Sequence, residues 1–239
     1  MKILALETSA KSVSTAVVEN GAVLASAFQC TGLTHSRTLM PMLDAMLRNA
    51  ELPLSSIDLF AAAAGPGSFT GLRIGVSALK GLAWTTGKPC AAVSTLEAMA
   101  QNLAFADGLL VCAMDARRSQ VYHALFEAHG GVLTRLCPDC AIGLDELERE
   151  VRGETRRLLV LGDGAVLAHG YLTAHGIDCS LAPDPLRWQS AVGVALCAER
   201  MAGRGETVSA QDLRPTYLRV SQAERERSAR LARSADANR

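Results

Sequence analysis

The stretch KILALETSAKSVSTAVVENGAVLASAF, residues 2–28, decides the fold of this chain. It contains three apolar segments, at 2–8, 12–18 and 22–28, and each has the length of a strand. Asn20-Gly21 separates the last two segments, and this dipeptide is typical of a type I′ hairpin because both of its residues accept a positive φ. The chain therefore opens as three strands joined by tight connections.

Beyond this opening, the sequence predicts helices that alternate with strands. A strand meander followed by such an alternation indicates an α/β layer with a mixed sheet. The expected elements are a helix at about 36–50, a strand at 57–64, a helix at about 70–86, a short strand near Cys90 and a helix at about 94–104.

A second round of the same pattern starts at Leu109, which predicts a duplicated fold with subdomains at 1–106 and 107–189. The segment at 220–239 is rich in Arg, Glu, Ser and Ala, and we expect this tail to be disordered. The elements of the second round are strands at 109–114, 120–128 and 132–136, a helix at 144–151, a strand at 157–162 and a last helix from Ser190 to about Met201.

The composition is that of a globular chain without net charge. Of 239 residues, 49% are hydrophobic and 20% are charged, which excludes a disordered or fibrous protein. The 24 basic and 24 acidic side chains cancel, so there is no global positive field for nucleic acid or an anionic membrane. Glu7 interrupts the first apolar run too early for a secretory signal, and no segment has the ~18 apolar residues of a membrane helix. We expect a cytoplasmic protein.

The two helices expected at 36–50 and 70–86 are more apolar than a helix on a sheet requires. Such a helix needs an apolar stripe of ~100°, whereas the second leaves only Arg73, Ser77 and Lys80 as a polar strip. Its three glycines each cost ~1 kcal/mol relative to alanine, and close approach to another helix would compensate. Burial within the domain is the commoner explanation for one such helix, but two of them favour a partner interface.

A glycine-containing loop, Gly65-Pro-Gly-Ser-Phe-Thr-Gly-Leu-Arg73, stands between a predicted strand and a predicted helix. It is not a P-loop or a dinucleotide-binding fingerprint, because Thr70 stands where both motifs require glycine. The helix N-terminus could still attract an anion. A tight turn with Ser68 or Thr70 as the N-cap explains the loop equally well.

Four segments carry a resemblance to a known family: MKILALETS, GPGSFTGLRIGVSALKGLA, AMDARRSQVY and LRPTYLR. The chain resembles the TsaB (YeaZ) family of bacterial threonylcarbamoyladenosine-biosynthesis proteins over about residues 1–219. The resemblance implies the actin-like, sugar-kinase-like (ASKHA) duplicated fold, ribonuclease-H-like in each half. It also implies that the final helix, about 190–203, packs back on the first subdomain.

The resemblance further implies a non-catalytic scaffold in the modification of tRNA. TsaB-like proteins pair with the catalytic subunit TsaD and with the small ATPase TsaE, so ATP or ADP is expected only at that complex. They contact tRNA indirectly or weakly. Family members use the two apolar helices for pairing with TsaD or with a second copy of themselves. Carried over to this chain, the interface residues are Leu39, Leu43, Met46, Leu72, Gly75, Val76 and Leu79.

The residues themselves argue against catalysis. Active members of the fold place an Asp-x-Gly-[Ser/Thr] turn after the first strand, but this chain has Glu7-Thr-Ser-Ala-Lys11, without glycine. The second phosphate loop is expected at 114–119, where Asp115 could hold magnesium but no glycine is present. We therefore predict no intrinsic cofactor. The alternative is a nucleotide-binding ATPase or kinase of this fold.

Metal chemistry has equally little support. No two of the five histidines are four residues apart, so the His-x-x-x-His motif of TsaD-like subunits is absent and a glycoprotease-like metallopeptidase lacks its ligands. Cys137 and Cys140 have ligand-like spacing, but no second pair lies nearby, and a turn with two incidental thiols is the simpler interpretation. Arg117, Arg118 and the arginines of the tail leave a weak tRNA contact open.

Overall fold

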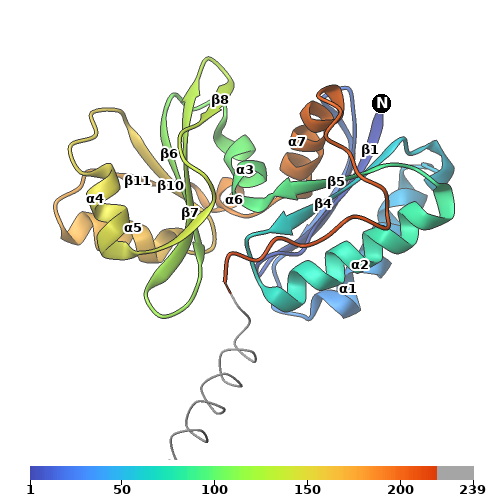
Figure 1. Cartoon of the computed structure of the whole chain (residues 1–239), viewed down its shortest axis with the longest axis horizontal. Coiled ribbons are helices and arrows are strands. Elements are labelled where there is room, and N and C mark those ends of the chain that lie inside the picture. Colours follow the sequence, from blue (N-terminus) through green and yellow to red (C-terminus); the bar gives the residue numbers. More distant parts are fainter. Residues whose placement is uncertain (220–239) are drawn as a thin grey trace, which may run out of the picture.

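Two sheets with the same strand order form two lobes, which lie side by side in Figure 1. The computed structural model describes residues 1–219, and the tail predicted to be disordered, at 220–239, lies outside the described residues. The first sheet has the order β3-β2-β1-β4-β5, and the second has the order β8-β7-β6-β10-β11. β9 pairs with β7 outside that path. The predicted duplication is therefore present at the level of topology.

In each sheet three strands form an antiparallel meander, and two further strands are parallel to the first strand of the meander. The turn between the first hairpin strands has φ of 49° at Asn20 and 79° at Gly21, as a type I′ turn requires. The expected α/β class with mixed sheets is confirmed. The strands are β1 (Lys2–Glu7), β2 (Val13–Glu19), β3 (Ala22–Gln29), β4 (Leu59–Gly65), β5 (Cys90–Ser94), β6 (Gly108–Asp115), β7 (Gln120–His129), β8 (Val132–Arg135), β9 (Cys140–Gly143), β10 (Leu158–Leu161) and β11 (Ser180–Leu181).

Helices cover both faces of the first sheet. α1 and α2 pack on one face and α7 packs on the other, against apolar side chains of β1, β2, β4 and β5. In the second lobe, α4 and α5 lie on one face, and α3 packs on the opposite face. No helix of the described chain is long and apolar enough to cross a membrane. The helices are α1 (His35–Asn49), α2 (Phe69–Thr86), α3 (Thr95–Ala100), α4 (Leu144–Val151), α5 (Ala165–Ala174), α6 (Asp184–Arg187) and α7 (Ala191–Gly203), with 3-10 turns at Leu54–Ser56 and Gln101–Leu103.

α3 holds the two lobes together. Its residues Leu96 and Met99 are fully buried in the core of the second lobe, although the helix follows directly from β5 of the first. Arg135 at the end of β8 reinforces this contact, because its guanidinium donates to Glu97 on α3 at 3.2 Å and to Asp139 at 2.6 Å. The lobes therefore share a packed interface with a charged clamp at its edge.

The loop before α2 shows how the sequence starts this helix. The side chain of Ser68 accepts a hydrogen bond from the backbone N–H of Gly71 at 3.3 Å, so Ser68 is the N-cap. Gly87 ends the helix with φ 66°, and its N–H donates to the carbonyl of Ala83 at 2.9 Å. The capping prediction for Ser68 is confirmed.

Candidate functional site

The structure places the predicted interface residues in the core of the first lobe. All seven face the sheet beneath α1 and α2, and the six with side chains are at most 7% exposed. In the isolated chain these side chains belong to the core, and only Leu43 and Val76 also line surface hollows, so the residue assignment stays a prediction and the helices themselves remain candidates. The residues are Leu39, Leu43, Met46, Leu72, Gly75, Val76 and Leu79.

Two glycines of α2 make close contacts within their own lobe, whereas the sequence suggested close approach to another helix. A Cβ on Gly75 would lie 2.3 Å from the hydroxyl oxygen of Thr8, and one on Gly71 would lie 2.1 Å from the carbonyl oxygen of Thr8. The same hydroxyl donates to the carbonyl of Gly71 at 2.8 Å. These two glycines therefore let α2 approach the end of β1 in its own lobe. Gly81 is different, because nothing lies within 4 Å of its Cβ position.

The outer surfaces of α1 and α2 expose apolar area. Met40 on α1 is 43% exposed and Trp84 on α2 is 69% exposed. A hollow of about 520 Å³ lies between the C-terminal half of α1, the loop after it and Leu82 of α2. Ala45 and Gly81 are exposed on the same two helices, and their small size would allow a partner helix to approach closely.

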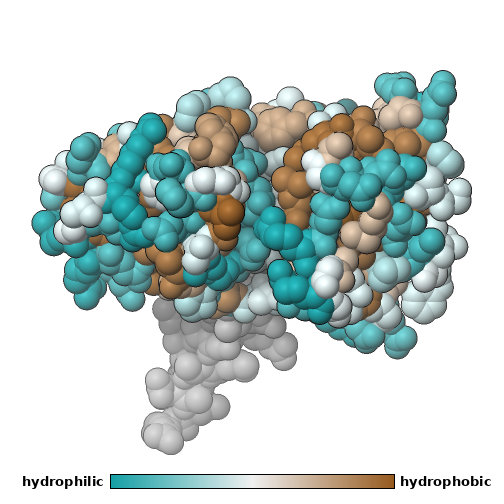
Figure 2. Space-filling model, turned by 90° about the horizontal axis from the view of Figure 1, so that it is seen from above, coloured by the Kyte–Doolittle hydropathy of each residue, from teal (hydrophilic) through white to brown (hydrophobic). Residues whose placement is uncertain are grey.

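Other apolar side chains are exposed on the same lobe. Figure 2, which views the molecule from above, shows hydrophobic side chains gathered over the first lobe and a more mixed surface on the second. On the edge strand β3, Val23, Leu24 and Phe28 are exposed. The first lobe thus has apolar surface on more than one element.

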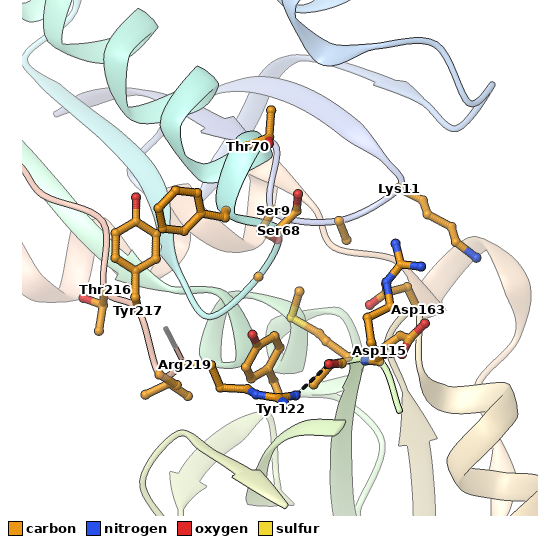
Figure 3. Close-up of a pocket in the computed structure, with 17 residues that line it drawn as sticks. Ser9, Lys11, Ser68, Thr70, Asp115, Tyr122, Asp163, Thr216, Tyr217 and Arg219 are labelled. Carbon is orange, nitrogen blue, oxygen red and sulfur yellow. Dashed lines mark hydrogen bonds between the residues drawn. The ribbon is translucent and has the colours of Figure 1, made fainter. Parts of the chain in front are cut away.

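A cleft of about 440 Å³ lies between the lobes, where the β1–β2 hairpin and the β6–β7 hairpin meet (Figure 3). Lys11 comes from the first hairpin and Asp115 from the second. Ser68 and Thr70 at the start of α2 form a third side, and Asp163 and Tyr122 complete the lining from the second lobe. This cleft is the place where enzymes of the expected fold would hold a nucleotide.

One backbone amide in each of the two hairpins already has a partner within the chain. In the first, the backbone N–H of Ser9 already donates to the carboxylate of Glu7. In the second, the N–H of Arg117 donates to Asp115 at 2.7 Å. An amide held in this way is not free to donate to a phosphate oxygen. No step through a bound triphosphate follows from this geometry.

One buried carboxyl group, Glu7, lies behind the cleft, and a second, half-buried one, Asp163, lines it. Burial raises the pKa of the Glu7 carboxyl to about 7, the charge of Asp163 adds to the increase, and the hydrogen bond from Ser9 opposes it. Burial also raises the pKa of Asp163, which accepts a hydrogen bond from the amide of Gln189 at 2.9 Å. The second oxygen of Glu7 has no hydrogen-bond partner. These groups resist ionisation.

Asp163 was not among the residues expected at the site. It lies in Gly162-Asp163-Gly164, between β10 and α5, and α5 was not predicted from the sequence. Gly162 has φ 112°, and a Cβ on it would lie 2.1 Å from the carbonyl oxygen of Ala113. A strand followed by Gly-Asp-Gly was the signal that could have identified this loop.

The end of the described chain crosses the mouth of the cleft. We call residues 207–219 the strap. The N–H of Thr216 donates to the carbonyl of Ala64 at 2.7 Å, and the ring of Tyr217 stacks on Phe69 with the centroids 4.4 Å apart. Arg219 then reaches the second lobe, where it donates to the carbonyl of Ala116 at 2.8 Å (Figure 3). The strap narrows the cleft from the side of α2.

Comparison with known proteins now identifies the family. A family model described as TsaD: tRNA N6-adenosine threonylcarbamoyltransferase matches residues 29–157. A tRNA threonylcarbamoyladenosine biosynthesis protein TsaB from Bacillus subtilis is 31% identical over 231 residues, which are 94% of this chain and 96% of the relative. The chain belongs to the TsaB (YeaZ) family. The Haemophilus influenzae protein of the same description is 38% identical over 125 residues, or 51% of this chain and 52% of that protein.

A solved YeaZ structure agrees with this membership. YeaZ from Pseudomonas aeruginosa has a TM-score of 0.76 and 28% identity, with 91% of this chain and 99% of that chain covered. The TsaB motifs now have places in the fold. AMDARRSQVY forms the second hairpin of the cleft, GPGSFTGLRIG caps α2, and LRPTYLR is the second half of the strap.

In this TsaB-family chain, the second hairpin has a strained turn. Arg117, Arg118 and Ser119 all have positive φ, between 56° and 68°, although none is glycine. Such backbone is costly for L-residues and persists where surrounding contacts hold it. Here the carbonyl of Ala116, just before the turn, accepts the hydrogen bond from Arg219, and the N–H of Ala116 donates to the carbonyl of Gln120 at 3.0 Å, which joins the two ends of the turn.

Histidines and cysteines do not gather into a metal site in the described part of the chain. His123 is buried on β7 and contacts the carboxylate of Glu150 at 3.0 Å, while burial lowers its pKa. Cys137 accepts a hydrogen bond from the N–H of Leu125 through its sulfur at 3.1 Å. Burial raises the pKa of Cys140 to about 11, so this thiol is held in its neutral form.

Proposed function

We propose that this chain is a non-catalytic, cytoplasmic partner subunit in the biosynthesis of threonylcarbamoyladenosine in tRNA, and that it pairs with a TsaD-like threonylcarbamoyltransferase. The match to a TsaB protein over nearly the whole length of both chains carries this proposal. The TsaE-like ATPase joins the resulting complex, and any ATP or ADP binds there. Alone, the chain pairs with a second copy of itself.

The geometry of the cleft supports a role without catalysis. One amide of each hairpin is hydrogen-bonded to a carboxyl group of the chain itself, and the strap lies across the opening. The lobes are joined through the buried side chains of α3 and the clamp of Arg135. A rigid interface of this kind suits a subunit that presents a fixed surface to its partner.

The outer surfaces of α1 and α2 are the proposed contact. The family model that matches residues 29–157 describes TsaD, so a TsaD-like partner shares this helical layer. Two related subunits can then pair through equivalent helices around an approximate two-fold axis. Met40, Ala45 and Gly81 lie on the exposed faces of these helices and replace the buried residues in the earlier assignment.

The test introduces a large cation at the proposed contact. Gly81→Arg and Gly170→Arg are matched, because both glycines are helical, exposed and free of atoms within 4 Å of the Cβ position. We expect Gly81→Arg to abolish the mixed complex with the TsaD-like subunit in light scattering, and to abolish threonylcarbamoylation of tRNA by the assembled subunits. Gly170→Arg on α5 should leave both unchanged. Equal behaviour of the two variants would refute the proposed contact, and a parent chain that never increases the activity of the TsaD-like subunit would refute the proposed function.

A further inference from the structure

A groove runs along α2 on the side facing away from α1. One wall is α2 and the other is the strap, which Figure 1 shows alongside this helix. Two adjoining hollows of about 750 and 580 Å³ make up the groove, and Trp84 and Gln211 line both. The strap is fixed there by a two-way backbone pairing between Val208 and Cys90, and by Lys80, which donates to the carbonyls of Gln211 and Leu213.

The charged side chains that line this groove are all positive. Arg73, Lys80, Lys88 and Arg214 line it, and no aspartate or glutamate does. Within residues 1–219, none of these four cations forms a salt bridge, and the hydrogen bonds they donate go to carbonyls and to the Tyr217 hydroxyl. The positive charge is therefore not neutralised locally.

The one acid of the strap is Asp212. Asp212 accepts a hydrogen bond from the hydroxyl of Ser209 at 2.6 Å, and it does not line either hollow. In a chain whose 24 basic and 24 acidic residues balance, a groove with four cations and no anion is a local concentration of charge. Such a surface attracts a polyanion.

Aromatic rings stand between the cations. Trp84 is 69% exposed at the middle of the groove, and Tyr217 is 39% exposed at one end. Tyr217 is held in place by Phe69, on which it stacks, and by the guanidinium of Arg73, which donates to its hydroxyl at 3.0 Å. Exposed rings beside cations are the elements of a stacking platform for nucleic-acid bases.

We propose that this groove binds a single-stranded segment of RNA, with its phosphates on the cations and a base stacked on Trp84. From Arg73 to Trp84 the helix rises by about 16 Å over eleven residues, so the groove is long enough for several phosphates of one strand. An acidic peptide would satisfy the charges but would leave the indole ring of Trp84 without a stacking partner. The ring and the cations together favour RNA.

This site borders the proposed partner surface, because Gly81 and Trp84 are three residues apart on α2, but its cations lie on a different flank of the helix. Arg73, Lys80 and Trp84 follow one another along α2 at spacings of seven and four residues, so they form one stripe, and that stripe faces the strap. Ile74, Ala78 and Leu82 lie on the flank toward α1. RNA binding can therefore be measured on the full chain alone and does not depend on pairing.

The experiment is a fluorescence anisotropy titration of a labelled twelve-nucleotide oligouridylate with the full chain, at 50 to 200 mM salt. With three or four phosphates neutralised, we expect log K to fall with log salt at a slope of about −2 to −3. Lys88→Gln should weaken binding and reduce that slope by about 0.7. Arg149→Gln is the matched control, because it removes the same charge from an exposed position on α4 and should leave binding unchanged.

Two substitutions of Trp84 test whether a base stacks on its ring. Trp84→Ala should weaken binding about tenfold, and Trp84→Phe should restore most of it, since a phenyl ring still stacks. The proposal is overturned if the oligonucleotide does not bind at 50 mM salt and ~100 μM protein, or if Lys88→Gln and Arg149→Gln have equal effects. It is also overturned if Trp84→Phe is as weak as Trp84→Ala, or if a polyglutamate peptide binds and the RNA does not.

Discussion

Replacing the buried carboxyl of Glu7 should change how stability depends on pH. Glu7 is fully buried at the end of β1, one of its oxygens has no hydrogen-bond partner, and burial raises its pKa from 4.5 to about 7. The folded state thus binds this proton more tightly than the unfolded state does. The contribution of Glu7 to stability is complete below pH 4.5 and decreases as the pH rises to 7.

The size of the change in stability follows from the shift in the pKa of Glu7. A difference of 2.5 units, from 4.5 to 7, corresponds to about 3 kcal/mol at 1.36 kcal/mol per unit. In Glu7→Gln the amide cannot ionise, so the variant does not lose this free energy of unfolding as the pH rises. The amide oxygen can still accept the hydrogen bond from the N–H of Ser9. Relative to the parent, the variant should therefore become more stable by about 3 kcal/mol between pH 4.5 and pH 8.

Urea unfolding followed by circular dichroism at intervals from pH 4.5 to 8.5 measures this difference. Only the difference between variant and parent is compared, because Asp163 and His123 also contribute to the pH dependence of both. Glu19→Gln, at the exposed end of β2 beside Lys2, is the matched control and should follow the parent. Parallel pH profiles for Glu7→Gln and the parent would refute the assignment of a buried, proton-binding Glu7.

Four further substitutions test the packing and the strap. Gly75→Val brings a Cβ to within 2.3 Å of the Thr8 hydroxyl oxygen and should cost about 1–3 kcal/mol in urea unfolding, whereas Gly81→Ala, with open space at its Cβ, should stabilise the chain by up to ~1 kcal/mol. Leu79→Ala should lower the free energy of unfolding by about 2–5 kcal/mol, because Leu79 lies in the core. A variant of unchanged stability that no longer binds the TsaD-like subunit would instead support Leu79 as an interface residue. Arg219→Ala should release the β6–β7 turn, measured as faster amide exchange at Gln120 and unchanged exchange in β1.

Local signals predicted the fold well where they were unambiguous. The Asn20-Gly21 turn and the alternation after it are properties of a few neighbouring residues, and the structure confirms the sheet that they indicate. The cap at Ser68 and the end of α2 at Gly87 depend equally on local backbone chemistry. α5 was missed because its sequence, AVLAHGYLTA, has no strong apolar stripe, and its position depends on packing against β6 and β10.

The candidate site was less accessible to prediction, because it depends on contacts between distant segments. The strap lies beside α2 although more than 100 residues separate them, and the sequence shows only the motif LRPTYLR. The choice of interface residues met the same difficulty. Broad apolar arcs on two helices show that much surface is buried, but the identity of the buried face depends on where the sheet lies. Gly75 was assigned to a partner because its actual neighbour, Thr8, is 67 positions away in the sequence.

The geometry of α2 explains how one helix could take part in three contacts. Successive residues are 100° apart around the axis, so an 18-residue helix presents several stripes with different neighbours. Leu72, Val76 and Leu79 face the core, Gly81 is open to solvent, and Arg73, Lys80 and Trp84 face the strap. Substitutions on the core stripe are expected to change the free energy of unfolding. Substitutions at Gly81 should change the mass of the mixed complex, and those on the stripe that faces the strap should change RNA affinity. A variant such as Trp84→Ala that altered all three measurements equally would show that the stripes are coupled, and the separation of partner surface and RNA groove would then fail.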